Sequence, residues 1–429
     1  MDSLSIDQKS PHMEYVDITK FQDADLVSIV IPNFNHGKYI GQAIQSVLCQ
    51  DYPNFEIIVV DDGSTDNSSE VVAQFGEKVH YIWQKNQGLS AARNTGIRAS
   101  NGQYIGVLDA DDLYEPNFIS TMMSNLKSQS DADGIYCGYQ FVDENNRLLP
   151  QIEARSIPET GLYRALLDGN FLVPESVLVH RYCYSKVGDF DPLLSACEDW
   201  DMWLRITSQY KIISTSKILT RHRTLPGSMS SNPSRMLSNR LAVLNKHLGP
   251  LSHGIEPVSS MNRRAYGRAY LSSCIEYLQY GSRENAFECL QNMSITCPSL
   301  LAELDTFYQL ACGDQPKGSM GDVYSIDLDR NEQVLMEMLS QLFEDDKTGG
   351  LEGFRSLAYS NAYFALGMIG YAAGKNKSAR RNLTKAILKN ARLGTRKSFV
   401  FLWIKTFLNA QFISFFRRWR QKTKMLGEN

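Results

Sequence analysis

Short apolar runs alternate with segments of helical periodicity over the first part of the chain. The runs that predict strands are 26–32, 55–60, 79–84 and 104–109, and the periodic segments that predict helices are 38–50, 68–75 and 89–100. The strand runs are nearly continuous in Val, Ile and Leu, which is typical of strands buried on both faces. We therefore expect an α/β domain with a mostly parallel sheet flanked by helices.

Polar residues stand where three of these apolar runs end. They are Pro32 and Asn33, Asp61 and Asp62, and Asp109 with Asp111. Because functional groups of open α/β sheets gather beyond the carboxyl ends of the strands, we expect these residues to share one edge of the sheet.

The short motif Asp109-Ala-Asp111 gathers negative charge in one place. Adjacent carboxylates repel one another unless a cation compensates them. Magnesium and manganese ions prefer hard oxygen ligands and often link carboxylates to a diphosphate. The motif therefore indicates a divalent metal site, although by itself a solvated turn is the simpler interpretation.

Residues 134–235 form a less regular region that contains a predicted helix at 195–206. This helix begins with Glu198 and Asp199, and acids in a first turn are favoured by the helix dipole, so a structural and a chemical role are both open. Trp200 and Trp203 are expected in the core rather than on a sugar-binding surface. The stretch PGSMSSNPS that precedes residue 235 predicts a loop and a domain boundary.

Residues 236–397 predict an all-α domain with a weak internal repeat. The pairs Ala-Tyr at 269 and 362, the glycines at 281 and 374, the alanines at 286 and 379 and the leucines at 290 and 383 share one offset of 93 residues. Gly at a turn and Ala where helices press together are expected of a helical repeat of the tetratricopeptide kind. A plain helical bundle is the alternative.

The net charge of −3 conceals a basic end. Residues 375–424 contain fifteen Lys and Arg and no acid, which indicates an anionic partner surface. Lys405 interrupts the apolar part of the segment 398–424, which disfavours a membrane-spanning helix. An amphipathic helix lying in a membrane interface and a helix docked on the protein remain two interpretations of the tail.

The remaining composition limits the location and the partners. Residues 1–25 are an acidic extension without an apolar stretch, which is not the pattern of a secretory signal peptide. The eight cysteines show no metal-ligand spacing, and we interpret them as buried thiols of a cytoplasmic protein. Peripheral contact with the inner face of the membrane is an expectation for the tail alone. The basic tail contains no nucleic-acid recognition module, so no nucleic-acid partner is expected.

Five ordered motifs, VSIVIPNFNHGKYI, IIVVDDGSTD, NQGLSAARNTGI, LDADD and EDWDMWLR, together resemble the inverting glycosyltransferases of family 2, which have the GT-A fold. The resemblance covers about residues 26–230. It implies a glycosyltransferase domain at 26–235, followed by the helical domain at 236–397 and the basic tail at 398–429. It also implies transfer of a hexosyl or hexosaminyl group from a nucleoside diphosphate, with UDP favoured, to a glycan, polysaccharide or lipid-linked acceptor. The implied cofactor is Mn2+ or Mg2+.

The resemblance also assigns roles to individual residues. The residues it implies for nucleotide-sugar binding are Pro32, Asn33, Asn35, Asp61, Asp62, Arg93, Asp109 and Arg223. It implies Asp111 with Asp109 as metal ligands, and Asp199 as the catalytic base with Glu198 as its neighbour. A metal and an arginine would neutralise the leaving diphosphate, and the base would take the proton of the acceptor hydroxyl.

One departure from the family pattern concerns the segment HRTLPGSMS. Members often carry Tyr-Arg-x-His before a Gly-Ser-x-Ser stretch, whereas here His222 stands at the Tyr position and Leu225 at the His position. A metal or phosphate contact made by that His is therefore absent or is taken over by His222.

Two other classes of function remain open. A catalytically inactive sugar-nucleotide-binding or helical-repeat scaffold is disfavoured by the acids at 109, 111 and 199, although Leu225 is compatible with it. A nucleotidyltransferase would need a Gly-rich, Arg-containing loop after the first strand, where this chain has PNFNHGKYI. No dinucleotide-binding G-x-G-x-x-G occurs either.

Overall fold

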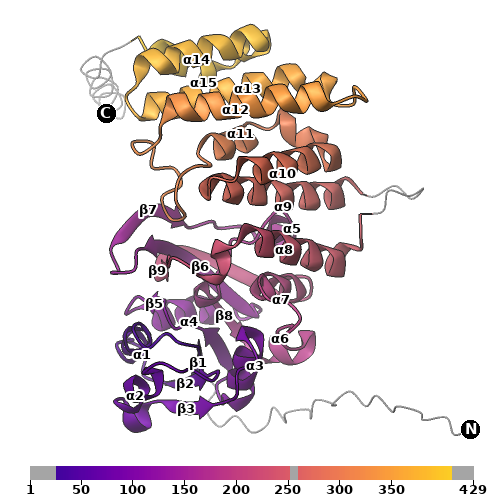
Figure 1. The fold of residues 1–429 in the computed structure, drawn as a ribbon. Helices are drawn as coiled ribbons and strands as arrows, with labels where there is room; N and C mark the ends of the chain where they lie inside the picture. Colours follow the sequence, from indigo (N-terminus) through magenta and orange to yellow (C-terminus); the bar gives the residue numbers. More distant parts are fainter. Residues whose placement is uncertain (1–25, 252–258, 408–429) are drawn as a thin grey trace, which may run out of the picture. The chain divides into compact units, whose positions relative to one another are not determined.

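The structure is a computed structural model that describes residues 26–251 and 259–407. Its internal contacts divide the chain into two units (Figure 1). The described part of unit 1 comprises 26–139, 154–163 and 172–222, and that of unit 2 comprises 140–153, 164–171, 223–251 and 259–407. The domain limits expected from the sequence remain predictions, and the segments 1–25 and 408–429 lie outside the described residues.

Unit 1 alternates strands and helices. Its strands are β1 (Val27–Asn33), β2 (Phe55–Asp61), β3 (His80–Trp83), β4 (Tyr104–Val107), β5 (Leu113–Tyr114), β6 (Gly134–Val142), β8 (Val177–His180) and β9 (Ile212–Arg223), of which β6 and β9 end in unit 2. Its helices are α1 (Ile40–Leu48), α2 (Ser68–Ala73), α3 (Leu89–Ala99), α4 (Phe118–Ser128), α6 (Arg181–Val187) and α7 (Glu198–Thr207), with short 3-10 turns η2 (Gly76–Lys78) and η3 (Pro174–Ser176). Helix α5 (Glu159–Leu167) begins in unit 1 and ends in unit 2.

The sheet has the strand order β3-β2-β1-β4-β8-β6-β9-β5, and β7 (Leu148–Glu153) pairs with β6. β1 pairs in parallel with β2 and β4, and β2 pairs in parallel with β3, whereas the β4–β8, β6–β8 and β5–β9 pairs are antiparallel. The predicted α/β class is confirmed, with a mixed sheet whose first four strands are parallel. The register places Asn33 opposite Asp61, so the carboxyl ends of β1 and β2 meet at one edge.

The continuous apolar runs are explained by burial on both faces of the sheet. In β2, Ile57 and Val59 belong to the core cluster that includes α1 and α4, whereas Ile58 and Val60 pack with Ala92 of α3. Burying one such side chain stabilises the fold by about 1.5–3 kcal/mol. A strand covered on both sides has no polar alternation, which is the pattern that predicted these strands.

Unit 2 is helical apart from β7 and the strand ends. Its helices are α8 (Pro233–Leu248), α9 (Ser260–Gln279), α10 (Arg283–Thr296), α11 (Leu304–Ala311), α12 (Leu328–Asp345), α13 (Glu352–Ala372), α14 (Asn376–Lys389) and α15 (Lys397–Lys405). Short 3-10 turns lie at η4 (Met229–Ser231), η5 (Pro298–Ala302) and η6 (Ala391–Thr395). In Figure 1, α9 lies beside α10, and α13 lies beside α14.

The predicted repeat is present in the backbone of unit 2. Helices α10 and α14 begin at 283 and 376, η5 and η6 at 298 and 391, and α11 and α15 at 304 and 397, so each pair is 93 residues apart. Gly281 and Gly374 both have a positive φ, 74° and 73°. The amide after each glycine donates to an equivalent carbonyl, Ser282 to Tyr277 at 2.9 Å and Lys375 to Gly370 at 2.8 Å. Both helix pairs therefore turn through the same glycine-dependent motif.

The expectation that the cysteines are buried is confirmed for most of them. Six of the eight cysteines are buried as predicted, Cys197 is partly exposed, and Cys49 is exposed, so the expectation of a buried thiol is wrong for Cys49.

In the ranges 26–251 and 259–407, no helix has the length and apolar character to cross a membrane. Of the predicted tail helix 398–424, only the part up to residue 407 belongs to the described residues.

Candidate active site

The loops that follow β1 and β2 are bonded to each other. The Oγ of Ser64 accepts from the side-chain amide of Asn33 at 3.1 Å and from the backbone amide of Asn35 at 2.9 Å. The Oδ1 of Asn35 in turn accepts from the amide of Thr65 at 2.8 Å. Asn35 has a φ of 57°, a conformation that Asn tolerates because its short side chain bonds locally. Two predicted nucleotide-binding residues thus lie at the edge beyond the β1 and β2 carboxyl ends.

Pro32 and Asp61 are buried parts of the same edge. Pro32 lies within β1, opposite Val60 of β2. The carboxylate of Asp61 accepts from the amide of Ser64 at 2.8 Å and from the hydroxyl of Tyr81 at 2.6 Å. Burial, together with the hydrogen bond to Asp61, raises the pKa of Tyr81. These contacts fix the turn after β2.

Asp62 is bonded to the loop that leads into α3. One oxygen accepts from the side chain of Gln84 at 2.7 Å and the amide of Gln87 at 2.9 Å, and the other accepts from the amide of Gly88 at 2.7 Å. Asp62 is buried, so its carboxylate shapes this loop rather than facing solvent. Asp62 thus has a structural role in this loop, and its nucleotide role remains a prediction.

Helix α3 lies unusually close to the sheet. A Cβ placed on Gly96 would lie 2.2 Å from Cγ1 of Val30, so only glycine fits there without a shift. The side-chain amide of Asn94 donates to the carbonyl of Phe190 at 2.9 Å and accepts from the amide of Phe190 at 2.8 Å. Arg93, which precedes Asn94 in α3, is buried.

Arg93 joins two of the predicted acids. Its Nη2 donates to both carboxylate oxygens of Asp109 at 2.8 and 3.0 Å, and its Nη1 donates to Glu198 at 2.5 Å. Burial opposes the cation, but Asp109 and Glu198 outweigh it and raise the pKa of Arg93. Three motifs that the sequence predicted separately therefore meet at one buried guanidinium. Since both Nη atoms are occupied by carboxylates, a direct contact of Arg93 with phosphate remains a prediction.

The first turn of α7 orients two adjacent acids differently. Glu198 is buried against Arg93, whereas Asp199 is partly exposed and accepts from the amide of Trp200 at 2.7 Å. Cys197, which precedes them, has a φ of 60°, a conformation that is uncommon for a residue with a side chain. Trp200 and Trp203 are buried, so their predicted core location is confirmed.

The acids after β4 form a tight turn in which the amide of Asp112 donates to the carbonyl of Asp109 at 3.0 Å. Burial, followed by the neighbouring charge of Asp112, raises the pKa of Asp111 to about 7, although His36 opposes the shift. Burial and the neighbouring carboxylate thus disfavour the charged form of Asp111. Carboxylate oxygens are ligands that magnesium and manganese prefer, so the residue types at 109 and 111 fit such a metal.

Sequence reasoning did not identify a second cluster, formed by Asp112, Glu175 and His222. The Nδ1 of His222 lies 3.2 Å from Asp112 and 2.9 Å from Glu175, and one ligand atom of each residue lies within 4.8 Å of the others. Burial disfavours the imidazolium, but Asp112 and Glu175 outweigh it and raise the pKa of His222 well above its usual value. The three residues are of types that bind metals, but a protonated His222 already supplies a positive charge beside the two carboxylates.

The signals for this cluster were unequal in the sequence. His222 was conspicuous because it stands at the family's Tyr position, and Asp112 adjoins the Asp-x-Asp motif. Glu175 lies in η3 before β8 and carried no local signal.

Arg223, which follows His222 in β9, belongs to unit 2, where its Nη1 donates to the carbonyls of Asp143 and Glu144 at 3.2 and 3.1 Å. Its predicted phosphate contact remains a prediction.

Curated proteins named glycosyltransferases match part of the chain. The chain is 36% identical over 197 residues to an uncharacterised glycosyltransferase of Rickettsia typhi, a match that covers 43% of this chain and 60% of that protein. It is 39% identical over 127 residues to glycosyltransferase GlyG of Streptococcus pneumoniae, which covers 29% of this chain and 42% of that protein. The chain thus spans less than two thirds of the length of these curated relatives.

Among solved structures, the chain matches TarS 1-349 of S. aureus in complex with UDP with a TM-score of 0.46 and 16% identity, covering 78% of this chain and 90% of that chain. A mannosyltransferase of Pyrobaculum calidifontis in complex with GDP-Man and Mn2+ has a TM-score of 0.44 and 15% identity, covering 78% and 86%.

The family comparison covers most of the elements that form the site. Residues 28–187 match the model of Glycosyl transferase family 2. The matched segment contains the loops after β1 and β2, Arg93 and the acids after β4, whereas Glu198 and Asp199 lie beyond it. This chain therefore carries a glycosyl transferase family 2 domain over residues 28–187.

Proposed function

We propose that this protein is an inverting glycosyltransferase that moves a sugar from a nucleoside diphosphate to a hydroxyl acceptor. The observation that carries the proposal is the buried ion pair of Arg93 with Asp109 and Glu198, beside the partly exposed Asp199. This arrangement joins the end of β4 to the start of α7 and leaves one accessible carboxylate next to a fixed, buried one. The family match of residues 28–187 and the relatives named glycosyltransferases support the same reaction class.

The donor would bind at the edge formed by the loops after β1 and β2. Pro32 and Asn33 end β1, and the hydrogen bonds of Asn35 with Thr65 hold the two loops together. Asp62 accepts from the side chain of Gln84 and from the backbone amides of Gln87 and Gly88. A pocket with fixed walls binds a nucleotide with less ordering cost than a loose one. We propose UDP as the nucleoside diphosphate and a hexosyl or hexosaminyl group as the sugar.

Asp111, with Asp109, would hold Mn2+ or Mg2+. The raised pKa of Asp111, caused by burial and then by Asp112, is the physical reason to place a cation there. When bound, such a metal neutralises charge on the leaving diphosphate. Arg93 keeps Asp109 ionised and oriented, because it bonds both oxygens of that carboxylate.

Asp199 would act as the base of the transfer step. The acceptor oxygen forms a bond to the anomeric carbon while the bond from that carbon to the diphosphate oxygen breaks, and Asp199 takes the hydroxyl proton. The nucleoside diphosphate leaves with the electron pair of the broken bond. Attack on the face opposite the leaving group inverts the anomeric centre. Glu198, held by Arg93, would position the start of α7 and therefore Asp199.

The acceptor is the least constrained partner. We propose a glycan, polysaccharide or lipid-linked hydroxyl at the cytoplasmic face of a membrane, with the segment 398–424 as a peripheral membrane contact. The support is the basic composition of residues 375–424. Residues 408–424 of this segment lie outside the described residues.

A donor panel tests the proposal. The purified chain would be incubated with UDP, TDP and GDP sugars and Mn2+, with release of nucleoside diphosphate and the anomeric configuration of the product as readouts. We expect turnover with inversion, strong loss in Asp111→Ala, and no loss in the control Asp51→Asn, which alters an exposed acid. Retention of configuration would contradict the proposed mechanism. Donor binding without turnover would instead favour an inactive scaffold.

A further inference from the structure

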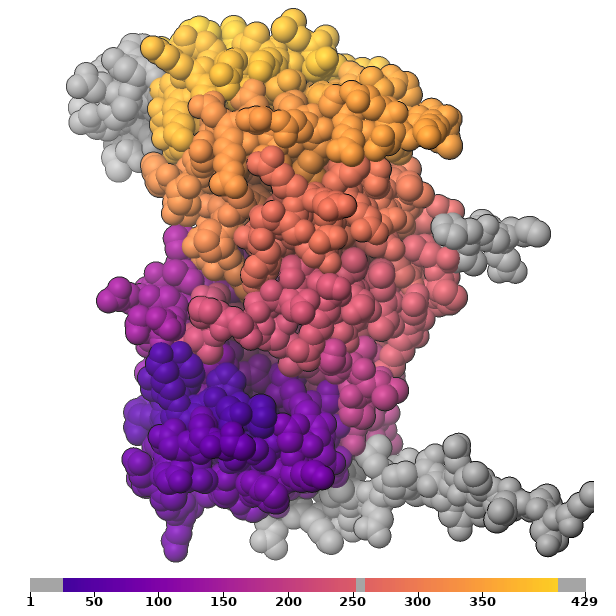
Figure 2. All heavy atoms as spheres, viewed as in Figure 1, coloured from indigo at the N-terminus to yellow at the C-terminus, as the bar shows by residue number. Residues whose placement is uncertain are grey.

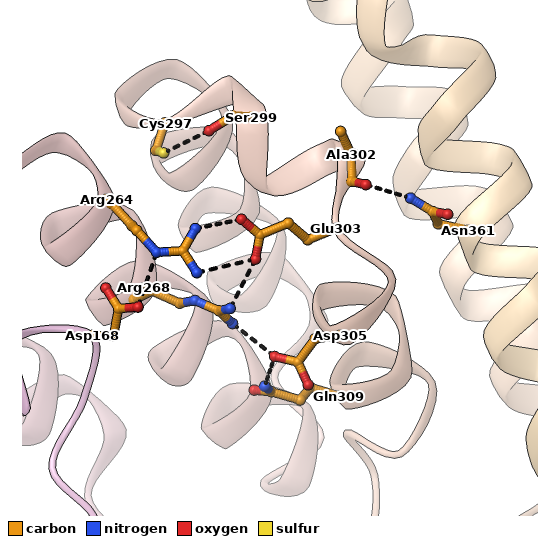
Figure 3. Close-up of polar contacts among 10 residues, drawn as sticks. All are labelled: Asp168, Arg264, Arg268, Cys297, Ser299, Ala302, Glu303, Asp305, Gln309 and Asn361. Atoms are coloured by element: carbon orange, nitrogen blue, oxygen red, sulfur yellow. Dashed lines mark hydrogen bonds and ion pairs between the residues drawn. The ribbon is translucent and has the colours of Figure 1, made fainter. Parts of the chain in front are cut away.

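The two repeats of unit 2 differ in what covers their last helix. In the first repeat, Phe307 and Ala311 of α11 are fully buried in a core cluster that contains residues of α12 and α13. Helix α13 also donates a hydrogen bond to the end of η5, from Asn361 to the carbonyl of Ala302 at 2.8 Å (Figure 3). The second repeat therefore covers the outer face of α11.

The equivalent helix of the second repeat is α15. One face of it packs on its own repeat, since Phe399 is buried with residues of α13 and α14, and Trp403 donates to the hydroxyl of Thr384 at 3.1 Å. Its other face is open in the described residues. Ile404, the counterpart of the buried Ala311, is 45% exposed. Phe401 is 65% exposed.

One further exposed aromatic residue follows α15. Phe407 is 51% exposed, although its ring also contacts Trp403 and Arg380. We call Phe401, Ile404 and Phe407 the terminal apolar face. Large apolar side chains gathered on one part of a surface mark an interaction site rather than ordinary scatter. Helix α15, which carries Phe401 and Ile404, belongs to the yellow part of the chain in Figures 1 and 2.

The charges that precede the terminal apolar face in the sequence differ between the repeats. Lys389, Arg392, Arg396 and Lys397 are exposed. Their counterparts 93 residues earlier are Thr296, Ser299, Glu303 and Leu304, which include one acid and no base.

The counterpart of Arg396 is used inside the first repeat. Glu303 accepts from Arg268 at 2.9 Å and also from Arg264, which contacts Asp168 at 2.9 Å (Figure 3). The basic charge is therefore particular to the terminal position. From residue 375 to 424 the sequence contains no acid at all.

We propose that the terminal apolar face, with its basic rim, docks on an anionic phospholipid surface. Aromatic and aliphatic side chains enter the headgroup boundary, and lysines and arginines bind the lipid phosphates, so one surface satisfies both features. An acidic protein would pair with the rim but would leave Phe401 and Ile404 without an apolar partner. The inference deepens the proposed function and rests on it for the nature of the acceptor, which would then be lipid-linked.

Vesicle co-sedimentation of the full chain tests the docking directly. We expect binding to vesicles of phosphatidylcholine with phosphatidylglycerol, little binding to phosphatidylcholine alone, and release in about 0.5 M salt, where screening is strong. The double variant Phe401→Asp with Ile404→Asp is expected to lower binding about tenfold, because it removes inserted apolar area. Ile295→Asp is the control, since Ile295 is a 66% exposed apolar residue of the first repeat.

Several outcomes would overturn the docking. The first is equal binding to neutral and anionic vesicles, and the second is unchanged vesicle binding by the double variant. The third is a dimer that forms without lipid and dissociates in the double variant, which would show that a second copy of the chain covers the face. If the double variant unfolds, the variant Arg396→Glu with Lys397→Glu takes its place, because it alters only exposed charges. Its binding to anionic vesicles must be lower than that of the wild type. Donor turnover measured without lipid separates the proposed membrane docking from the proposed transfer reaction. If docking alone is wrong, vesicle binding fails while turnover persists, and if the transfer reaction alone is wrong, turnover fails while vesicle binding persists.

Discussion

Arg93 forms a two-armed ion pair with Asp109, at 2.8 and 3.0 Å, although the two residues belong to different elements. The same guanidinium reaches Glu198 at 2.5 Å and is almost fully buried. One cation thus fixes the acid that follows β4 and the acid that begins α7. The geometry of the proposed site depends on this cation more than on any single carboxylate.

Replacing Arg93 by Met is expected to destabilise the fold by about 3–5 kcal/mol, because the buried Glu198 and the partly buried Asp109 lose their cation. Urea unfolding of the wild type and the variant measures the change. Adding Glu198→Gln to Arg93→Met removes one uncompensated charge and should restore part of the loss. A variant as stable as the wild type would show that the ion pair is not held in solution.

The His222 cluster gives a second prediction that is specific to this chain. Changing His222 to Tyr restores the family pattern at this position but leaves Asp112 and Glu175 without their cation. We expect a loss of about 3 kcal/mol in the free energy of unfolding. Glu175→Gln in the same chain should recover much of it. Unchanged stability of the single variant would mean that His222 is not the compensating charge.

The close approach of α3 to the sheet predicts the effect of a single methyl group. Gly96→Ala would place a Cβ 2.2 Å from Val30, and overpacking of this kind costs about 1–3 kcal/mol. Because the shift displaces α3, transfer activity should fall as well. Gly353→Ala is the control, since nothing lies within 4 Å of a Cβ there. Thermal unfolding that ranks the two variants equally would exclude the packing argument.

His180 predicts part of the pH dependence of stability. Burial, and then Arg181, lowers the pKa of His180 from 6.5 to about 4. The unfolded chain therefore takes up this proton at higher pH than the folded chain, so stability is full above pH 6.5 and is lost as the pH falls toward about 4.

His180→Asn keeps an acceptor for the amide of Tyr182, which His180 caps at 3.2 Å. Its free energy of unfolding should decline less than that of the wild type between about pH 7 and pH 5. Equal declines in the two proteins would show that His180 does not titrate differently on folding.

Local pattern predicted the elements of the parallel half-sheet. The doubly buried runs at 26–32 and 55–60 correspond to β1 and β2, and the Gly281 and Gly374 turns appear where the repeat placed them. Such features depend on residues close in sequence. The antiparallel strands after β4 lie in the region 134–235 that the sequence described only as less regular, and no local signal gave their order in the sheet.

The partners of the site residues could not be predicted in the same way. Arg93 and Asp62 were expected at a nucleotide, but in the structure Arg93 bonds Asp109 and Glu198, and Asp62 bonds the loop before α3. These pairings join elements far apart in the chain, and only the packing of α3 decides them. Glu175 was missed for the same reason, since a single buried acid has no periodic signature.

The most direct test of the central claim separates donor binding from turnover in Asp199→Asn. Calorimetry should give donor affinity, in the presence of Mn2+, close to that of the wild type, because Asp199 holds neither the nucleotide nor the metal in this account. Transfer to the acceptor should fall by about 10²–10⁴-fold, the usual contribution of a positioned base. Turnover within a few-fold of the wild type would contradict the assignment of Asp199.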